Sequence, residues 1–439
     1  MATDLLETVL DLAGRDPRTI PAQAREMARL SLYDWILCGL AGKDEPVAGY
    51  IHRLAESEGG ANVASAISGG LFPPRMAALV NGTISHALDF DDTHFGHLAH
   101  VSVAVYPAAL AAAEETDAAL DEMIDAYVLG AEAAIRVGMT LGMDHYDRGF
   151  HQTATSGAFG ATVAAARLYG LDREQTRTAL GLCATRASGL KSQFGTMGKP
   201  YNAGIAASNG IEVVKLARIG FSGPFDGLTG AQGFVPTHSS APKQAPGPSR
   251  RFLFEDIRYK FHACCHGTHA MVEALLIAMK GRDLKLGDIA ACKIRTSPRW
   301  MSVCNIPTPQ TGLEVKFSYR WLAGMVLDGR PTGSIALYAD DLAEDPALIA
   351  FAEHVEVIPD DAVGYMQAEC MLELADGTRI ETHFDLETPI EPEDVDASLR
   401  KKARDMFGDA AAGFDRVLDA HGSMTASDVG AILREGTHG

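Results

Sequence analysis

Residues 81–100 read NGTISHALDFDDTHFGHLAH, a stretch of twenty residues that contains four histidines and three acidic residues. An apolar, alanine-rich segment follows over residues 101–113 and is predicted to be a helix. If the stretch itself begins as a helix, His86 and Asp89 lie one turn apart on one face. The chain is then expected to break at residues 90–93. The local structure predicted for residues 81–113 is a short polar segment between two apolar helices.

That polar segment also contains His94, His97 and His100. A cluster of titratable side chains between apolar helices suits proton transfer at neutral pH, because histidine titrates close to pH 7. Metal ligation or a solvated surface would give the same composition, and both remain alternatives. For His94 and His97 the sequence does not distinguish a supporting role from exposure.

The first half of the chain is predicted to be helical, from Asp4 to about Ser222. It includes one long helix over Ala119–Leu141 and another over Ser156–Tyr169, whose glycines and alanines indicate close packing against neighbouring helices. Asp172 is predicted to cap the helix that follows. Residues 223–251 are rich in proline, glycine and serine and are expected to be an irregular surface segment.

The second half changes character after a short helix that follows His269. Strands are predicted at Ile289–Thr296 and His354–Ile358, and a hairpin at Cys370–Leu386 that turns at Asp376-Gly377. The expected fold is mainly α with a smaller α/β domain. The expected domains are a helical domain over 1–268, an α/β domain over 269–393, and C-terminal helices over 394–439 that return to the helical domain.

Composition narrows the function classes. The length of 439 residues predicts two domains, and the net charge of −19 argues against nucleic acid or an anionic membrane as a partner. The seven cysteines are scattered and odd in number, which favours a reducing cytoplasm over a disulfide framework. No signal peptide or membrane-spanning run is expected. An anionic substrate would need a locally basic pocket, for which His100, His151, Lys199 and Arg320 are the candidates.

Three further motifs accompany the first one. They are GFHQTATSGAFG at 149–160, FGTMGKPYNAGIAASNG at 194–210 and YKFHACCHGTHAMVEA at 259–274. In this order, the four motifs resemble the MmgE/PrpD family, which includes 2-methylcitrate dehydratase, cis-aconitate decarboxylase and iminodisuccinate epimerase. The resemblance implies a large helical domain, a smaller α/β lid domain, an active site between them, no cofactor, and a homodimer.

The resemblance also implies which residues act. Asp89, His100, His151 and Lys199 match the family's catalytic positions, although this chain has one extra residue before His100. Three alternatives remain: Asp89 could pair with His86 at the end of a helix, His151 could cap the next helix, and Lys199 could be a solvated loop lysine. The candidate substrate-binding residues are Thr93, Tyr146, Arg148, Cys265, His269, Arg320 and Trp321.

The fourth motif departs from the pattern of the decarboxylases. Cys265 stands where that branch has a catalytic histidine, and Trp321 stands where it has a pocket tyrosine. Tyr319, two residues earlier, is not expected to substitute. The histidines and cysteines of residues 262–269 also suggest a metal site, but adjacent cysteines do not easily bind one tetrahedral ion and the spacing fits no usual zinc pattern. No metal is expected.

The predicted function is that of a lyase which removes a proton next to a carboxylate and eliminates water from a small polycarboxylate, as in 2-methylcitrate dehydratase. Such a reaction needs a positioned base, an acid for the departing hydroxyl, and cations for the developing charge. The alternatives are an epimerase or isomerase of a substituted succinate, a decarboxylase similar to the cis-aconitate enzymes, and an inactive relative that acts as a binding dimer. Tyr146 with His100 could flank the substrate of an epimerase.

Overall fold

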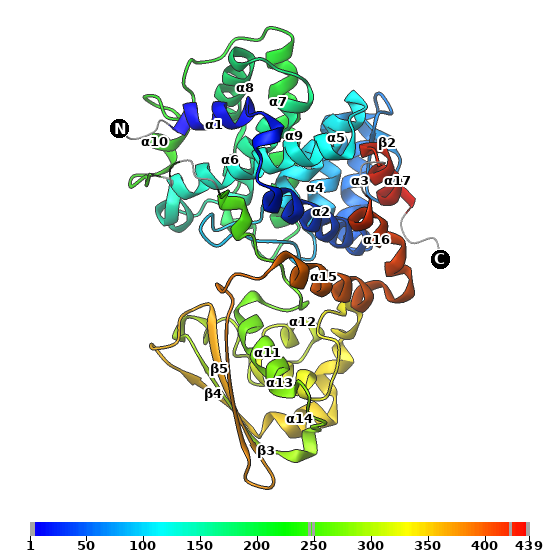
Figure 1. Ribbon diagram of the computed structural model, residues 1–439, viewed down its shortest axis with the longest axis vertical. Coiled ribbons are helices and arrows are strands. Elements are labelled where there is room, and N and C mark those ends of the chain that lie inside the picture. Colours follow the sequence, from blue (N-terminus) through cyan, green and yellow to red (C-terminus); the bar gives the residue numbers. More distant parts are fainter. Residues whose placement is uncertain (1–4, 245–246, 248–250, 421–423, 436–439) are drawn as a thin grey trace. The chain divides into compact units, whose positions relative to one another are not determined.

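The computed structural model describes residues 5–244, 247, 251–420 and 424–435. The chain forms two compact units (Figure 1): the first comprises Met1–Tyr259 and Ala412–Gly439, and the second comprises Lys260–Ala411. A mainly helical fold with a smaller α/β part is therefore confirmed. Of the predicted irregular segment over 223–251, residues 245–246 and 248–250 lie outside the described residues. The rest is largely irregular, with the short helix α10 (Phe234–His238).

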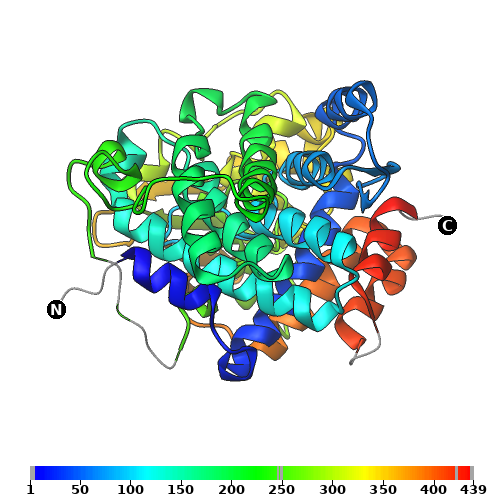
Figure 2. The ribbon, with the colours of Figure 1, turned by 90° about the horizontal axis from the view of Figure 1, so that it is seen from above.

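The first unit is a bundle of helices with one two-stranded ribbon, β1 (Ala64–Ser65) paired with β2 (Leu71–Phe72). In both views α1 lies on one flank of this unit and α17 on the other (Figure 1 and Figure 2). The remaining helices of the described residues are α1 (Leu5–Ala13), α2 (Ala22–Gly42), α3 (Pro46–Glu58), α4 (Pro74–Ser85), α5 (Ser102–Thr116), α6 (Leu120–Asp147), α7 (Gln152–Leu168), α8 (Arg173–Arg186), α9 (Gly198–Arg218), α16 (Ala412–Asp419) and α17 (Ala426–Glu435).

The centre of the first unit is built from α4, α5, α6, α7 and α9, which are packed at very short range. Helices α6 and α7 touch through backbone: a Cβ built on Gly130 would lie 2.5 Å from the carbonyl oxygen of Gly160. Helices α4 and α9 meet in the same way, and a Cβ on Gly82 would lie 2.8 Å from the Cα of Gly204. The predicted close packing of the Gly- and Ala-rich helix over residues 156–169 agrees with these contacts.

Several predicted boundaries agree with the structure. The long helix is α6, which extends to Asp147 and has a kink at Gly142, where φ is 64°. Asp172 caps α8, since its carboxylate accepts a hydrogen bond from the backbone N–H of Gln175 at 2.8 Å. The first motif differs from the expectation. Helix α4 ends at Ser85, so His86 and Asp89 do not share a helical face.

The second unit contains a four-stranded sheet with the order β4-β3-β5-β6. Strand β3 (Ile289–Thr296) runs parallel to β4 (Val355–Pro359) and antiparallel to β5 (Gln367–Leu374), which pairs with β6 (Arg379–Asp385). The two predicted strands and the hairpin are therefore confirmed, and the hairpin turns at Asp376-Gly377 as expected, where Gly377 has a φ of 84°. Helix α11 (His266–Met279) packs against β5 and β6.

The other helices of the second unit are α12 (Gly312–Val315), α13 (Tyr319–Leu327), α14 (Pro346–Ala352) and α15 (Pro392–Phe407). The structure assigns residues 260–268 and 394–411 to this unit, whereas the sequence assigned both to the helical domain. The physical reason lies in α15, which buries Val395, Leu399 and Ala403 and contacts the 3-10 turns at Ile335–Leu337 and Gly408–Ala411. Of the C-terminal helices, α16 and α17 belong to the first unit.

Within the described part of the chain, no helix combines the length and the apolar character needed to cross a membrane.

Candidate active site

The segment between α4 and α5 carries the predicted cluster. It leaves α4 at Ser85 and reaches Asp89, which has a φ of 53°, a left-handed conformation that is uncommon for a residue other than glycine. This local strain turns the chain so that the next carboxylates face back toward the helices. His86 and Asp91 are fully buried, whereas half of the Asp89 side chain (49%) is exposed.

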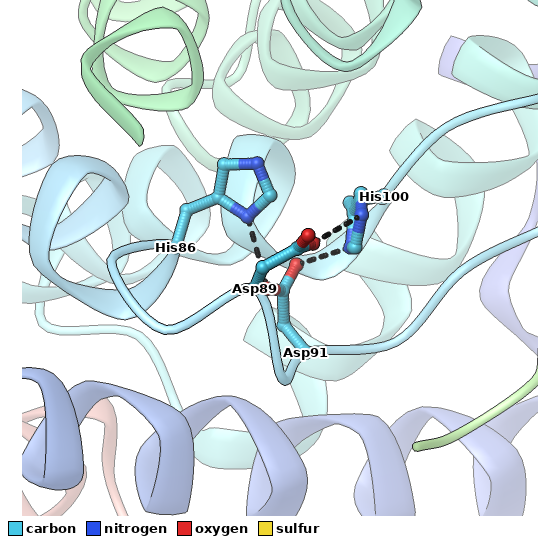
Figure 3. A group of neighbouring side chains, drawn as sticks. All are labelled: His86, Asp89, Asp91 and His100. Atoms are coloured by element: carbon cyan, nitrogen blue, oxygen red, sulfur yellow. Dashed lines mark hydrogen bonds and ion pairs between the residues drawn. The ribbon is translucent and has the colours of Figure 1, made fainter. Parts of the chain in front are cut away.

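Asp91 is the centre of the cluster (Figure 3). One of its carboxylate oxygens lies 2.9 Å from Nδ1 of His86, and the other lies 2.7 Å from Nδ1 of His100. The two imidazole rings meet edge to face, with centroids 4.6 Å apart. Asp91 therefore accepts a hydrogen bond from the His86 ring and is an ion-pair partner of the His100 ring.

Asp89 connects this group to a distant helix. Its Oδ1 lies 3.0 Å from Nε2 of His100, and its Oδ2 lies 2.6 Å from Nζ of Lys199 in the first turn of α9. The alternative in which Asp89 pairs with His86 is wrong, because His86 pairs with Asp91. The alternative of a solvated loop lysine is also wrong, since the Lys199 side chain is 16% exposed and paired.

His151 joins the same region from the start of α7. It stands at the N-cap position, but its side chain makes no capping hydrogen bond. Instead, the Asn202 amide nitrogen donates to Nδ1 of His151 at 3.2 Å, and the edge of the Phe194 ring faces the imidazole. The His151 ring stacks on His86 at 6.0 Å. The proposed capping role is therefore wrong, and the ring faces the cluster.

The pKa values of His100 and His151, the two rings on either side of His86, shift in opposite directions. Burial disfavours protonation of His100, but the carboxylates of Asp91 and Asp89 outweigh burial and raise its pKa above the usual value. Burial lowers the pKa of His151 well below the usual range, and the neighbouring His86 and Lys199 lower it further. Burial also lowers the pKa of His86, against the pull of Asp91. Of these rings, His100 is the one whose environment favours the protonated form, and His151 is neutral at neutral pH.

Asp92 and Thr93 anchor the segment between α4 and α5 to other parts of the first unit. The Asp92 carboxylate accepts hydrogen bonds from the backbone N–H and the hydroxyl of Ser102, at the start of α5. Burial, and after it the carboxylate of Asp34, raise the pKa of Asp92 to about 7. Thr93 exchanges two backbone hydrogen bonds of 2.8 Å with Arg258, and its buried hydroxyl has no hydrogen-bond partner among the described residues.

His94 and His97 lie outside the cluster. Nε2 of His94 donates to the carbonyl oxygen of Leu253 at 2.9 Å, and Nε2 of His97 lies 2.6 Å from the hydroxyl of Ser156. Both rings are buried. Burial lowers the pKa of His94 to about 4 and that of His97 well below the usual value. Both rings therefore stay neutral at neutral pH, and their hydrogen bonds to Leu253 and Ser156 hold the segment between α4 and α5 in place.

Tyr146 and Arg148 have contacts of a different kind. The ammonium group of Lys191 lies 3.5 Å from the centroid of the Tyr146 ring and donates to the Tyr146 carbonyl oxygen at 3.0 Å. Arg148 is exposed, and its charge acts on Asp144 and His238. Neither residue is joined by these contacts to the cluster around Asp91.

The remaining candidates lie in the second unit. Cys265 begins α11 and is partly exposed, and buried His269 donates from Nε2 to the carbonyl oxygen of Cys264 at 3.3 Å. The buried Trp321 indole N–H and the Arg320 Nε lack hydrogen-bond partners among the described residues. Tyr319 does not substitute for the missing tyrosine, as expected, because its hydroxyl donates to the carbonyl oxygen of Gly267 at 2.8 Å inside this unit.

The first cluster also has the chemistry of a metal site. One possible ligand atom from each of His86, Asp89, Asp91 and His100 lies within 4.8 Å of the others. Among the described residues, these four form the only such group of histidine, cysteine and acidic side chains. The cysteines and histidines of residues 262–269 do not form such a group in that part of the chain. The four residues are already joined to one another by ion pairs, so they neutralise each other without an ion.

Sequence reasoning missed three residues that shape the site: Asp91, Asn202 and Phe194. Asp91 stood inside the first motif, and the signal that could have found it is its position between two histidines at distances of five and nine residues. Asn202 and Phe194 flank Lys199 in the third motif. Their contact with His151 could not be read from spacing, because it joins the starts of two different helices.

Fold and site together define a mainly helical protein of two units, in which a buried carboxylate orients two histidines beside a lysine. Family models match both units: that of the MmgE/PrpD N-terminal domain matches residues 12–246, and that of the MmgE/PrpD C-terminal domain matches residues 262–413. The chain belongs to the MmgE/PrpD family.

Several curated relatives are lyase-type enzymes. The chain is 31% identical over 280 residues to the cis-aconitate decarboxylase-like protein oryM of Aspergillus oryzae, a match that covers 59% of this chain and 58% of that protein. It is 27% identical over 359 residues to the cis-aconitate decarboxylase of Homo sapiens, covering 76% of this chain and 74% of that one. The cis-aconitate decarboxylase of Aspergillus terreus is 30% identical over 276 residues, or 58% of this chain and 56% of the relative.

Proposed function

We propose that this protein is a cofactor-independent lyase that transfers a proton at a carbon next to a carboxylate of a small polycarboxylate. The observation that carries the proposal is the different surroundings of two histidines on either side of the His86 ring: His100 lies against the carboxylates of Asp91 and Asp89, whereas His151 lies against the Asn202 amide and Phe194. His100 has a raised pKa and His151 a lowered one, and both rings contact His86. Environments that push two pKa values apart mark an acid and a base.

The roles follow from these charges. His151 is neutral and serves as the base. Its Nδ1 accepts a hydrogen bond from the Asn202 amide, so Nδ1 bears the lone pair and Nε2 carries the ring proton, and Nδ1 takes the proton of the carbon acid once the substrate displaces Asn202. His100 carries the proton that a departing group needs. Lys199 supplies positive charge for the substrate carboxylate, whose negative charge grows as the proton leaves. Asp89 pairs with both Lys199 and His100 and holds them in place before the substrate binds.

The reaction we favour is the loss of water, because the hydroxyl leaves only when it is protonated and His100 is the ring whose environment favours the protonated form.

Decarboxylation is the second candidate, because the relatives found are named cis-aconitate decarboxylases or cis-aconitate decarboxylase-like. It requires a proton donor for the carbanion that remains after CO2 departs, and His100 would serve. Cys265 and Trp321 argue against it, since they stand where that branch is expected to have a histidine and a tyrosine.

Proton NMR in D2O tests the reaction. The purified protein is incubated with methylcitrate, citrate, cis-aconitate and substituted succinates, one at a time. A new vinylic signal from a hydroxylated substrate supports dehydration, and itaconate from cis-aconitate supports the second candidate instead. Deuterium on the α-carbon without net loss of substrate indicates an epimerase. Silence across the whole panel contradicts the proposed substrate class.

Lys199→Ala tests the anion site, with Lys215→Ala on the same helix as the matched control. Lys215 pairs with Glu115 at 2.7 Å, away from the cluster. A hydrogen bond to a charged group contributes about 1.5–3 kcal/mol, so kcat/KM should fall about 10- to 100-fold in Lys199→Ala and stay unchanged in the control. Unchanged turnover in a correctly folded Lys199→Ala variant removes this lysine from the mechanism.

A further inference from the structure

Two cysteines that are 39 residues apart in the sequence meet in the second unit. The thiol of Cys304 donates a hydrogen bond to the sulfur of Cys265, and the two sulfur atoms are 3.2 Å apart. A disulfide bond is about 2.05 Å long, so the sulfurs need to approach by only about 1.2 Å to form one. The proposed proton-transfer chemistry uses neither thiol as a redox group.

The surrounding backbone holds both sulfurs where they are. The Cys265 N–H donates to the carbonyl oxygen of Lys316 at 3.0 Å, and the Cys304 N–H donates to that of Trp300 at 2.7 Å. Gly267 provides the space between them: a Cβ there would lie 2.9 Å from the Cys304 sulfur. Main-chain contacts therefore fix the backbone that carries each of the two thiols.

The two thiols differ in access. Cys265 is partly exposed, whereas the other cysteines, Cys304 included, are buried. Cys265 is also the N-cap residue of the fourteen-residue helix α11, where the positive end of the helix dipole favours an anionic sulfur. A small oxidant would reach Cys265 first, with Cys304 directly behind it.

The adjacent Cys264 is a different kind of thiol. Its sulfur lies 3.1 Å from the Thr268 hydroxyl, and burial raises its pKa to about 12. It is buried and points toward α11 rather than toward Cys304, so it serves as the matched control for the pair.

We propose that Cys265 and Cys304 form a reversible oxidation site, at which a peroxide converts the two thiols into an intrachain disulfide.

The chemistry balances in two steps. The Cys265 thiolate attacks one oxygen of hydrogen peroxide, breaks the O–O bond and becomes a sulfenic acid, while the other oxygen leaves as hydroxide and takes up a proton to become water. The Cys304 sulfur then attacks the sulfenic sulfur and loses its proton, and the S–OH oxygen leaves as a second water. Two thiols are oxidised by two electrons, which reduce one peroxide to two waters.

The second step becomes easier once the first has occurred. The pKa of Cys304 is raised in the dithiol, first by its hydrogen bond to Cys265 and then by burial. Oxidation of Cys265 to the sulfenic acid turns the partner of that hydrogen bond into an electrophilic sulfur, which lies directly against the Cys304 sulfur and is open to its attack.

The test is peptide mapping of the purified full-length protein, treated with hydrogen peroxide, alkylated, and digested with trypsin without reduction. We expect peptide 261–280 to be joined to peptide 300–316 in the monomer, and to separate again after dithiothreitol. The number of thiols that react in denaturant should fall from the seven of the sequence by two. Cys264→Ser should form the same linked peptide, which assigns the bond to Cys265.

Cys304→Ser tests the order of events. In this variant the sulfenic acid at Cys265 should persist and be trapped by dimedone, whereas Cys265→Ser should give neither the linked peptide nor the trapped adduct. Thermal unfolding of each variant shows that it is folded. Oxidation of Cys265 to a sulfinic acid in the wild-type protein without any linked peptide would overturn the proposal, as would a linked peptide that persists in Cys265→Ser.

Discussion

Asp91 determines the charge of the site at the level of single residues. Both of its oxygens are used, one by His86 and one by His100, and it is fully buried. Burial alone would raise its pKa, but the two histidines outweigh burial and hold the pKa of this carboxyl well below its usual range. A permanently charged carboxylate beside His100 is the main reason why that ring keeps its proton.

Asp91→Asn should therefore shift the pH profile of kcat/KM. Asparagine keeps the shape but removes the negative charge, so the pKa of His100 should fall. If protonated His100 is the acid, the decline in rate at alkaline pH should begin at lower pH than in the wild-type protein. Histidine NMR titration measures the same pKa directly. Asp121→Asn, an exposed carboxylate that pairs with Arg29, is the control and should leave the profile in place. An unshifted profile in Asp91→Asn would separate Asp91 from the charge of His100.

Removal of metal ions is expected to have no effect. The nitrogen and oxygen atoms that could bind an ion in the cluster of His86, Asp89, Asp91 and His100 already pair with one another. Dialysis against a chelator should therefore leave turnover unchanged, and addition of Zn2+ should inhibit by competing for these ligands. A loss of activity with the chelator, restored by one divalent ion, would show that the cluster works as a metal centre.

At the level of elements, the crossing of α4 and α9 places the site. Gly82 and Gly204 touch through backbone, and these glycines lie about one turn before His86 and somewhat more than one turn after Lys199. The close contact therefore brings the end of α4 and the start of α9 together. The cluster depends on two residues that have no side chain to contribute.

Gly204→Ala should disrupt this crossing. The added Cβ would lie 2.3 Å from the carbonyl oxygen of Leu79, so the helices must separate. Overpacking of this kind costs about 1–3 kcal/mol of the free energy of unfolding, and activity should fall because Lys199 moves with α9. Gly49→Ala in α3, where nothing lies within 4 Å, should instead stabilise by about 0.5–1 kcal/mol. Denaturant unfolding of both variants measures the difference, and equal effects would show that the crossing tolerates a methyl group.

Helix and strand positions could largely be predicted from the sequence, because they follow from local periodicity. Strand β3 has the predicted bounds, and Asp172 caps α8. The end of α4 could not be predicted in this way. Nothing in the local pattern stops the helix at Ser85. Beyond it Asp91 pairs with His86 and His100 of the same segment, and Asp92 accepts from Ser102 at the start of α5.

At the level of the whole molecule, buried neutral histidines make stability depend on pH. Among the described residues, burial lowers the pKa of several rings in the folded state. These are His86, His94, His97, His145, His151 and His269. A lowered folded pKa contributes stability above the unfolded value of 6.5, and this contribution is lost as the pH falls toward the folded value. His100 and Asp92, whose pKa values are raised, act in the opposite sense but are fewer.

The melting temperature should therefore decrease steeply between pH 6.5 and 4. For His94, with a pKa of about 4, the loss is on the order of 3 kcal/mol across this interval. Thermal unfolding followed by circular dichroism at a fixed scan rate checks the expectation. His94→Gln should be less stable at pH 7.5 but should lose less on acidification. A melting temperature that stays constant from pH 7 to 5 would contradict the assignment of neutral buried rings.

The sequence by itself determined most of the helical and strand segments and the family, because periodicity and motifs are local properties of the chain, and it supplied the candidate site residues Asp89, His100, His151 and Lys199. Only the tertiary structure decided which groups pair. Asp91 lies between His86 and His100, Asn202 holds His151 from another helix, and Asp89 joins Lys199 through a left-handed turn. These pairings set the charge of each histidine, since a pKa depends on burial and on neighbours in space, which spacing along the chain does not contain.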